Sequence, residues 1–186
     1  MADEVRVWDV VEPVGVRVDD VDVADSFADL YRDRYRDVYR YILLMLRSTD
    51  EAEDATADTF GRAWSAWCDG RGPQGQSLPW LLLIARRIVI DRTRRRRLLA
   101  WLPLPFLSPG HEPATEADTG RSEFWLWFDR FASELPARQR EVLILRYQRD
   151  LDDQSIGEIL GLTESGVRSL VARACETLRR NPEIWR

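Results

Sequence analysis

Apolar residues recur at three- and four-residue steps along most of this chain, which is the spacing of helices that bury one face. The first helical stretch is predicted to begin at Ser26, a residue type favoured at the N-cap. Before it, valine alternates with polar residues, as in a strand, but an isolated hairpin is marginally stable at best. We therefore predict that residues 1–25 form a mobile acidic extension. The apolar positions of the first helix are Phe27, Leu30, Tyr31, Val38, Ile42 and Leu46.

Two further helices are predicted in this first domain, which we place at residues 26–100. Asp50 and Glu53 resemble a capping box and predict that the second helix begins near Asp50. A loop at residues 68–77, rich in glycine, breaks the helical pattern. The third helix is predicted to begin at Ser77 and to end in a cluster of arginines.

A second domain follows at residues 122–186, after a proline-rich linker at residues 101–121. Its pattern predicts one helix that Pro136 opens and two more at about 153–160 and 164–180. Gly161, Leu162 and Thr163 separate this last pair, which is the layout of a helix-turn-helix. The expected fold is all-α, with two small helical domains.

Charge is strongly segregated along the chain, although the net charge is −5 and the isoelectric point is about 5.1. Residues 1–30 are acidic, whereas residues 86–97 contain seven arginines and one aspartate. Local fields steer a protein to nucleic acid, so the acidic average does not argue against DNA binding.

Several classes of function are disfavoured by what the sequence contains. The single histidine, His111, lies in the predicted linker, so a histidine-based catalytic or zinc site cannot be built. The two cysteines are far apart, and the apolar runs are too short to span a bilayer. We expect a cytoplasmic protein without membrane insertion, intrinsic catalysis, bound metal or other cofactor.

The last helix of the second domain carries the strongest signal for DNA recognition. Small polar residues at the start of such a helix let its backbone enter the major groove, where Arg168 can reach a guanine edge. The candidate DNA-binding residues on its outward face are Glu164, Ser165, Arg168, Ser169 and Arg173.

Two pairs of segments resemble a known family, in the same order and joined by a similar linker. AEDATADTFGRAW (52–64) and PWLLLIARRIVIDRTRRRR (79–97) resemble region 2 of extracytoplasmic-function sigma factors, of the sigma-70 family. LPARQREVLILRY (135–147) and GLTESGVRSLVARA (161–174) are similar to their region 4. The resemblance covers about residues 26–180. It implies a promoter-specificity subunit that binds core RNA polymerase and promotes strand opening at promoters.

The resemblance also implies roles for individual residues. In region 4, the helix-turn-helix would contact the −35 element, and the domain would meet the flap region of the polymerase. The loop 68–77 would capture a base flipped out of the −10 element, and an anti-sigma factor is a further partner that the family allows. The residues implied for docking on the clamp helices of the largest polymerase subunit are Glu53, Asp54 and Asp58; those implied for the −10 element are Asp69, Arg71, Arg86, Arg87, Arg94 and Arg95.

Two alternatives remain open from the sequence. One is a helix-turn-helix regulator that binds duplex DNA without docking on core polymerase. The other is a sigma-like interaction scaffold that has lost DNA binding. Departures from the family pattern at Ala57, Arg87 and Leu170 keep this second alternative open.

Overall fold

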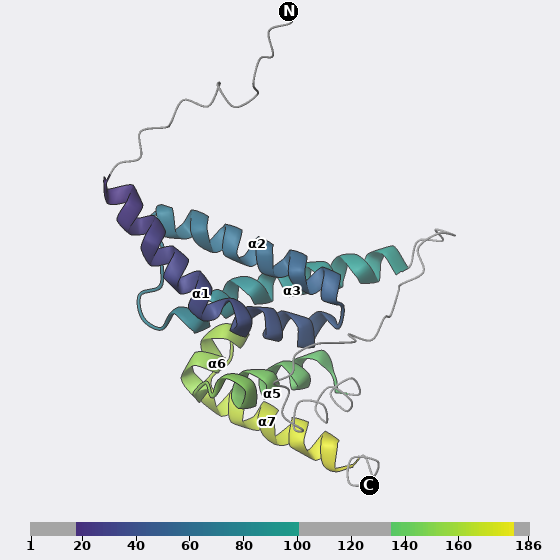
Figure 1. Ribbon diagram of the computed structural model, residues 1–186. Coiled ribbons are helices and arrows are strands. Elements are labelled where there is room, and N and C mark those ends of the chain that lie inside the picture. Colours follow the sequence, from purple (N-terminus) through teal and green to yellow (C-terminus); the bar gives the residue numbers. More distant parts are fainter. Residues whose placement is uncertain (1–17, 101–134, 181–186) are drawn as a thin grey trace, which may run out of the picture.

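The computed structural model describes residues 18–100 and 135–180, and within these ranges the regular elements are all helices (Figure 1). The predicted linker and the first part of the predicted second domain, residues 122–134, lie outside the described residues, as does the N-terminal stretch 1–17. The all-α class and the two-domain arrangement are confirmed. The helices are α1 (Val18–Leu46), α2 (Thr49–Cys68), α3 (Ser77–Ala100), α5 (Ala137–Arg149), α6 (Asp153–Leu160) and α7 (Glu164–Arg179).

Helices α1, α2 and α3 pack together as the first domain. Its interior contains small and branched apolar side chains, and two threonines are fully buried among them. The Thr56 hydroxyl donates to the Ala52 carbonyl at 2.6 Å and that of Thr59 to the Ala55 carbonyl at 2.7 Å. These bonds satisfy the hydroxyls within their own helix, so their burial leaves no unpaired donor.

In this domain the predicted start of the first helix is wrong, whereas α2 begins at Thr49, within one residue of the predicted start, and only its predicted cap is wrong. Helix α1 begins at Val18, upstream of the predicted Ser26, so residues 18–25 of the predicted acidic extension are helical. Lengthening an established helix adds one hydrogen bond per residue fixed, whereas an isolated strand gains no partner. Helix α2 is capped by Ser48, whose hydroxyl accepts from the Glu51 backbone N–H at 3.4 Å, and not by Asp50.

The turn between α1 and α2 depends on a left-handed residue. Arg47 has φ 58°, and its N–H donates to the Leu43 carbonyl at 2.8 Å to end α1. The chain thus reverses within two residues and brings α2 alongside α1.

Helices α5, α6 and α7 form the second domain, and α6–α7 is the predicted helix-turn-helix. Gly161 adopts φ 67° and ends α6, while the Thr163 hydroxyl accepts from the Gly166 N–H at 3.2 Å to begin α7. A Cβ at Gly157 would lie 2.6 Å from the Leu162 carbonyl oxygen, so the tight turn also requires a glycine inside α6. The prediction of this motif is confirmed in its bounds and its caps.

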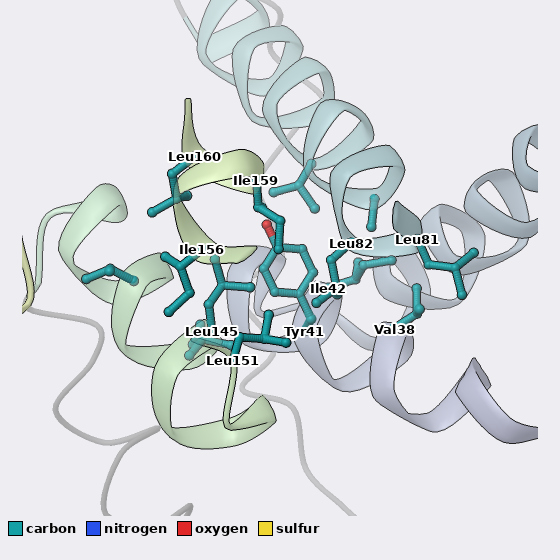
Figure 2. Close-up of a cluster of buried hydrophobic side chains, with 14 of the residues drawn as sticks. Val38, Tyr41, Ile42, Leu81, Leu82, Leu145, Leu151, Ile156, Ile159 and Leu160 are labelled. Atoms are coloured by element: carbon teal, nitrogen blue, oxygen red, sulfur yellow. The ribbon is translucent and has the colours of Figure 1, made fainter. Parts of the chain in front are cut away.

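The two domains pack directly against each other, with α6 against α3 and α5 against α1. Figure 2 shows Tyr41 and Leu82 of the first domain beside Ile156 and Ile159 of the second. These side chains belong to one continuous apolar cluster that crosses the domain boundary. Across the described ranges, no helix is both long enough and apolar enough to cross a membrane.

Candidate nucleic-acid and polymerase interface

The outward face of α7 carries every predicted residue of the helix-turn-helix site. Val167, Leu170 and Ala174 are buried against the rest of the domain, which fixes the rotation of the helix. The opposite face is exposed, and its polar start lies beside the Thr163 cap. The exposed members of this face are Glu164, Ser165, Arg168, Ser169 and Arg173.

Arg168 is positioned by two carboxylates, one at the start of α6 and one at the start of α7. Its guanidinium donates to Asp153 at 3.2 Å and to Glu164 at 3.5 Å, and its side chain remains 60% exposed. Exposed ion pairs of this kind contribute well under about 1 kcal/mol each, so DNA can displace them. The pairs hold the side chain near the helix start without removing it from solvent.

Apart from Arg86, which is described below, the arginines of α3 include an exposed set and a set that pairs with α2. Arg87, Arg94 and Arg95, all predicted for the −10 element, are exposed. Arg92 and Arg96 instead reach α2, where Arg92 pairs with Asp58 at 2.7 Å and Arg96 with Glu51 at 2.5 Å. The sequence pattern does not separate these sets, because it gives each arginine a helix position but no partner.

The acidic residues predicted for polymerase docking lie on one exposed side of α2. Glu53, Asp54 and Asp58 are all exposed, and Asp54 has 77% of its side chain accessible. Asp58 also binds Arg92 of α3, so it contributes to packing between helices as well as to the acidic surface. We call Glu53, Asp54 and Asp58 the docking surface, after the role that the sequence predicts for them.

The loop between α2 and α3 is compact and turns through Gly70, which has φ 70°. Arg71 and Asp69, both predicted site residues, are exposed and pair with each other at 2.5 Å. A groove of about 390 Å³ separates the loop from α6, and its walls include Gln76 and Trp80 on one side and Ser155 and Glu158 on the other. The second domain thus lies close to the predicted base-capture loop.

Arg86 differs from the other predicted DNA contacts because it lies at the domain boundary. Its side chain is only 17% exposed, and its Nε donates to Glu141 Oε1 of α5 at 3.0 Å. The Tyr41 hydroxyl of α1 donates to the same oxygen at 2.7 Å. We call Tyr41, Arg86 and Glu141 the Glu141 cluster.

The Glu141 cluster was not predicted from the sequence. Tyr41 is fully buried and Glu141 is 4% exposed. Burial, followed by the carboxylate of Glu141, raises the pKa of the Tyr41 phenol well above its ordinary value. The available signal was Glu141 directly before the apolar run Val142–Leu145, where a charge calls for a buried partner.

A second ion pair crosses the domain boundary at the other end of α5. Arg149 binds Asp37 of α1, and the Arg149 side chain is only 12% exposed. Burial lowers the pKa of the Arg149 guanidinium, and the neighbouring Asp37 partly opposes this change.

Comparisons with known proteins agree with this architecture. The family Sigma-70 region 2 matches residues 30–98, and Sigma-70, region 4 matches residues 132–180. The ferric citrate uptake sigma factor FecI of Escherichia coli is 30% identical over 135 residues, which cover 70% of this chain and 76% of FecI. The ECF RNA polymerase sigma factor SigM of Bacillus subtilis is 26% identical, over 75% of this chain and 84% of SigM.

One longer relative and one solved structure complete the comparison. The probable RNA polymerase sigma factor RfaY of Xanthomonas campestris is 30% identical over 74% of this chain, but the match spans only 35% of RfaY. The sigma factor RpoE of Bartonella quintana, solved with the anti-sigma factor NepR, has a similar fold with a TM-score of 0.71. That similarity covers 87% of this chain and 99% of RpoE at 21% identity. The chain therefore belongs to the extracytoplasmic-function sigma factors of the sigma-70 family, non-catalytic subunits that serve transcription initiation through regions 2 and 4.

Proposed function

We propose that this sigma factor divides promoter recognition between α7, which binds the −35 element, and α3 with its preceding loop, which binds the opened −10 element. Sigma factors bind core RNA polymerase and promoter DNA, and the docking surface on α2 is the proposed contact with the clamp helices of the largest subunit. The observation that carries the proposal is the separation of these charged surfaces on different helices, each exposed to solvent.

The −35 role rests on the geometry of α7. Its buried face holds the helix against α5 and α6, so the exposed face projects as a rigid unit. Short side chains at Ser165 and Ser169 leave room for the helix to enter a major groove, and Arg168 and Arg173 supply donors for guanine or phosphate.

The −10 role rests on α3. Arg94 and Arg95 are exposed and are distinct from Arg92 and Arg96, which pair with α2, so they can meet a phosphate backbone without loss of those pairs. The adjacent loop from Asp69 to Gln76 supplies the proposed pocket for an extruded base. Binding of the extruded form offsets the few kcal/mol that unstacking costs, so strand opening needs no catalytic group.

An anti-sigma factor is the third partner that we infer. Sigma factor RpoE, which has this fold, was solved in complex with the anti-sigma factor NepR. Tyr31 and Trp64 of the first domain are 42% and 38% exposed, and exposed aromatic side chains of this size are frequent in protein interfaces. A regulatory partner that covers the first domain would bury them.

Run-off transcription with core polymerase and a promoter library tests the proposal directly. We expect specific transcripts that depend on the purified chain, because it supplies promoter recognition to the core enzyme. Duplex binding without transcription would favour a regulator that acts without core polymerase. Absence of both DNA binding and transcription would favour a sigma-like interaction scaffold that has lost DNA binding.

The docking surface has its own test. Asp54→Arg should weaken binding to core polymerase at least tenfold, because it reverses an exposed charge in the docking surface, while duplex −35 binding stays unchanged. The matched control is Glu176→Arg, which makes the same charge change near the end of α7. Equal loss of core binding in both variants would contradict a specific role for α2.

The arginines of α3 give a second test. Arg94→Gln with Arg95→Gln should weaken binding of a single-stranded −10 non-template oligonucleotide and reduce the slope of log affinity against log salt by about 1.4. Arg138→Gln, at an exposed position of α5, is the control and should leave the slope unchanged. An unchanged slope in the double variant would exclude these arginines as phosphate contacts.

A further inference from the structure

The domain boundary buries charged groups that each need a partner from the other domain. Glu141 lies in α5 of the second domain, yet both hydrogen bonds recorded for its carboxylate come from the first domain, from Tyr41 and Arg86. A buried carboxylate without such donors is strongly destabilising. Glu141 therefore favours the observed packing of the two domains over any other packing that would bury its carboxylate without these partners.

The Asp37–Arg149 pair acts in the same direction at a separate point of the boundary. Asp37 and Arg149 are 20% and 12% exposed, so solvent screens their attraction less than it screens the surface pairs of α7. Two independent polar contacts therefore fix the rotation of the second domain on the first.

Apolar packing fills the space between these contacts. Ile156 and Ile159 of α6 are almost fully buried, and Figure 2 shows them beside Tyr41 and Leu82. The contact joins α6 to α3 and leaves the outward face of α7 exposed. Separation of the domains would expose this apolar surface to water, which opposes opening.

The docked arrangement occupies part of the proposed −10 site. Arg86, one of the α3 arginines proposed for DNA, is held by Glu141. Helix α6 faces the loop 73–76 across the groove, so the second domain stands next to the place where an extruded base would enter. Opened −10 DNA would therefore compete with the second domain for Arg86 and for access to the loop.

We propose that the free sigma factor is closed by an interdomain latch, formed by the Glu141 cluster and the Asp37–Arg149 pair, which withholds Arg86 and the base-capture loop from the −10 element until the domains separate. The regulatory consequence rests on the proposed −10 role of α3 and its loop; the closed state itself rests only on the contacts described above. The latch does not cover the proposed −35 face of α7.

The two cysteines of the chain allow a direct test. Cys68 lies at the end of α2 in the first domain, Cys175 lies in α7 of the second, and neither forms a disulfide. Spin labels at these sites report the interdomain distance in the full chain by double electron–electron resonance. We expect one narrow distance distribution for the unmodified sequence in the absence of polymerase and DNA.

Substitutions in the Glu141 cluster should open the chain. Glu141→Gln keeps the side-chain size but loses the charge that Arg86 and Tyr41 bind, and Tyr41→Phe keeps the ring but loses its hydroxyl. Each should raise the population of longer distances by about tenfold and strengthen binding of a −10 non-template oligonucleotide by a similar factor. Glu176→Gln, an exposed change of the same type, should alter neither quantity.

A charge exchange guards against variants that merely disturb folding. Asp37→Arg and Arg149→Asp should each lengthen the distance, and the double variant should restore the narrow distribution because the pair is re-formed with reversed polarity. A broad distribution in the unmodified chain, or distances that none of these variants changes, would overturn the latch.

The readouts separate failure of the latch from failure of the proposed function. The distance measurement contains no DNA and no polymerase, so it tests the closed state alone. Variants that open the chain without any gain in oligonucleotide binding would confirm the contacts but overturn their regulatory role. Run-off transcription by the same variants then reports whether the chain initiates at all.

Discussion

At the scale of single residues, Tyr41 connects burial to pH dependence. Its phenol is fully buried, and its pKa is raised above the ordinary value near 10, first by burial and then by Glu141. In the unfolded chain the phenol ionises near pH 10, whereas in the folded chain it stays protonated to higher pH. The stability that the neutral phenol provides is therefore complete below pH 10 and is lost as pH rises from there through the raised folded pKa.

Tyr41→Phe should remove this alkaline dependence. We expect the unmodified chain to lose free energy of unfolding more steeply than the variant does as pH rises above 10. At pH 7 the variant should be less stable by about 1–2 kcal/mol, because a hydrogen bond to a charged group is lost. Urea denaturation at pH 7 measures the difference in stability, and urea denaturation at a series of pH values above 10 measures the alkaline dependence.

Tyr31→Phe is the control for this experiment. Tyr31 is 42% exposed and packs its ring against Phe60, a contact that phenylalanine preserves. The variant keeps the buried Tyr41 phenol, so it should retain the steep loss of free energy of unfolding above pH 10. If Tyr41→Phe shows the same steep loss as Tyr31→Phe, the buried phenol is not the titrating group.

At the scale of elements, the helix ends are set by local contacts and the helix faces by packing. The turn between α1 and α2 places Arg47 in the left-handed region at φ 58°, where a residue with a Cβ is strained by about 1–2 kcal/mol. Glycine adopts this conformation readily but gives the unfolded chain more freedom. The relief of backbone strain is the larger of these two effects, so the folded chain should be more stable with glycine than with arginine at position 47.

Arg47→Gly should raise the free energy of unfolding by up to about 1 kcal/mol, because relief of strain exceeds the added entropy of the unfolded chain. Arg62→Gly, at an exposed position inside α2, should lower it by about 1 kcal/mol, since glycine weakens a helix interior. Thermal denaturation of the two variants tests the opposite signs. Destabilisation by both would show that the Arg47 side chain stabilises the turn more than its backbone strains it.

At the scale of the whole molecule, the two domains share one apolar cluster and two partly buried polar contacts. Units that share a core unfold together, whereas independent domains unfold in separate steps. The shared boundary also links conformation to function, because the residues that join the domains include one proposed for DNA.

Calorimetry should therefore record one unfolding transition for the unmodified chain. Asp37→Arg places like charges at the boundary, so we expect it to separate the transition into two as the domains become independent. The exchange variant, with Arg149→Asp added, should return the single transition. Two transitions in the unmodified chain would show that the boundary is too weak to couple the domains.

The helical class, the helix-turn-helix and the family could be predicted from the sequence, because they depend on local signals. Hydrophobic periodicity, helix caps and turn glycines act over a few residues. The sequence therefore correctly predicts the turn at Gly161 and the helix cap at Thr163. The start of α1 was missed because its valine–aspartate alternation has the period of a strand, although the segment is helical.

Which charges meet across the domain boundary depends on the packing of the two domains and could not be predicted from the sequence. Arg86 and Arg87 are adjacent in the sequence, yet Arg86 is partly buried against Glu141 and Arg87 is exposed. A helical period gives each residue a face but does not say which distant element covers that face. Glu141 is separated along the chain by 100 residues from Tyr41 and by 55 from Arg86, and Arg149 by 112 from Asp37. Only the packing of α5 and α6 on α1 and α3 brings these residues together.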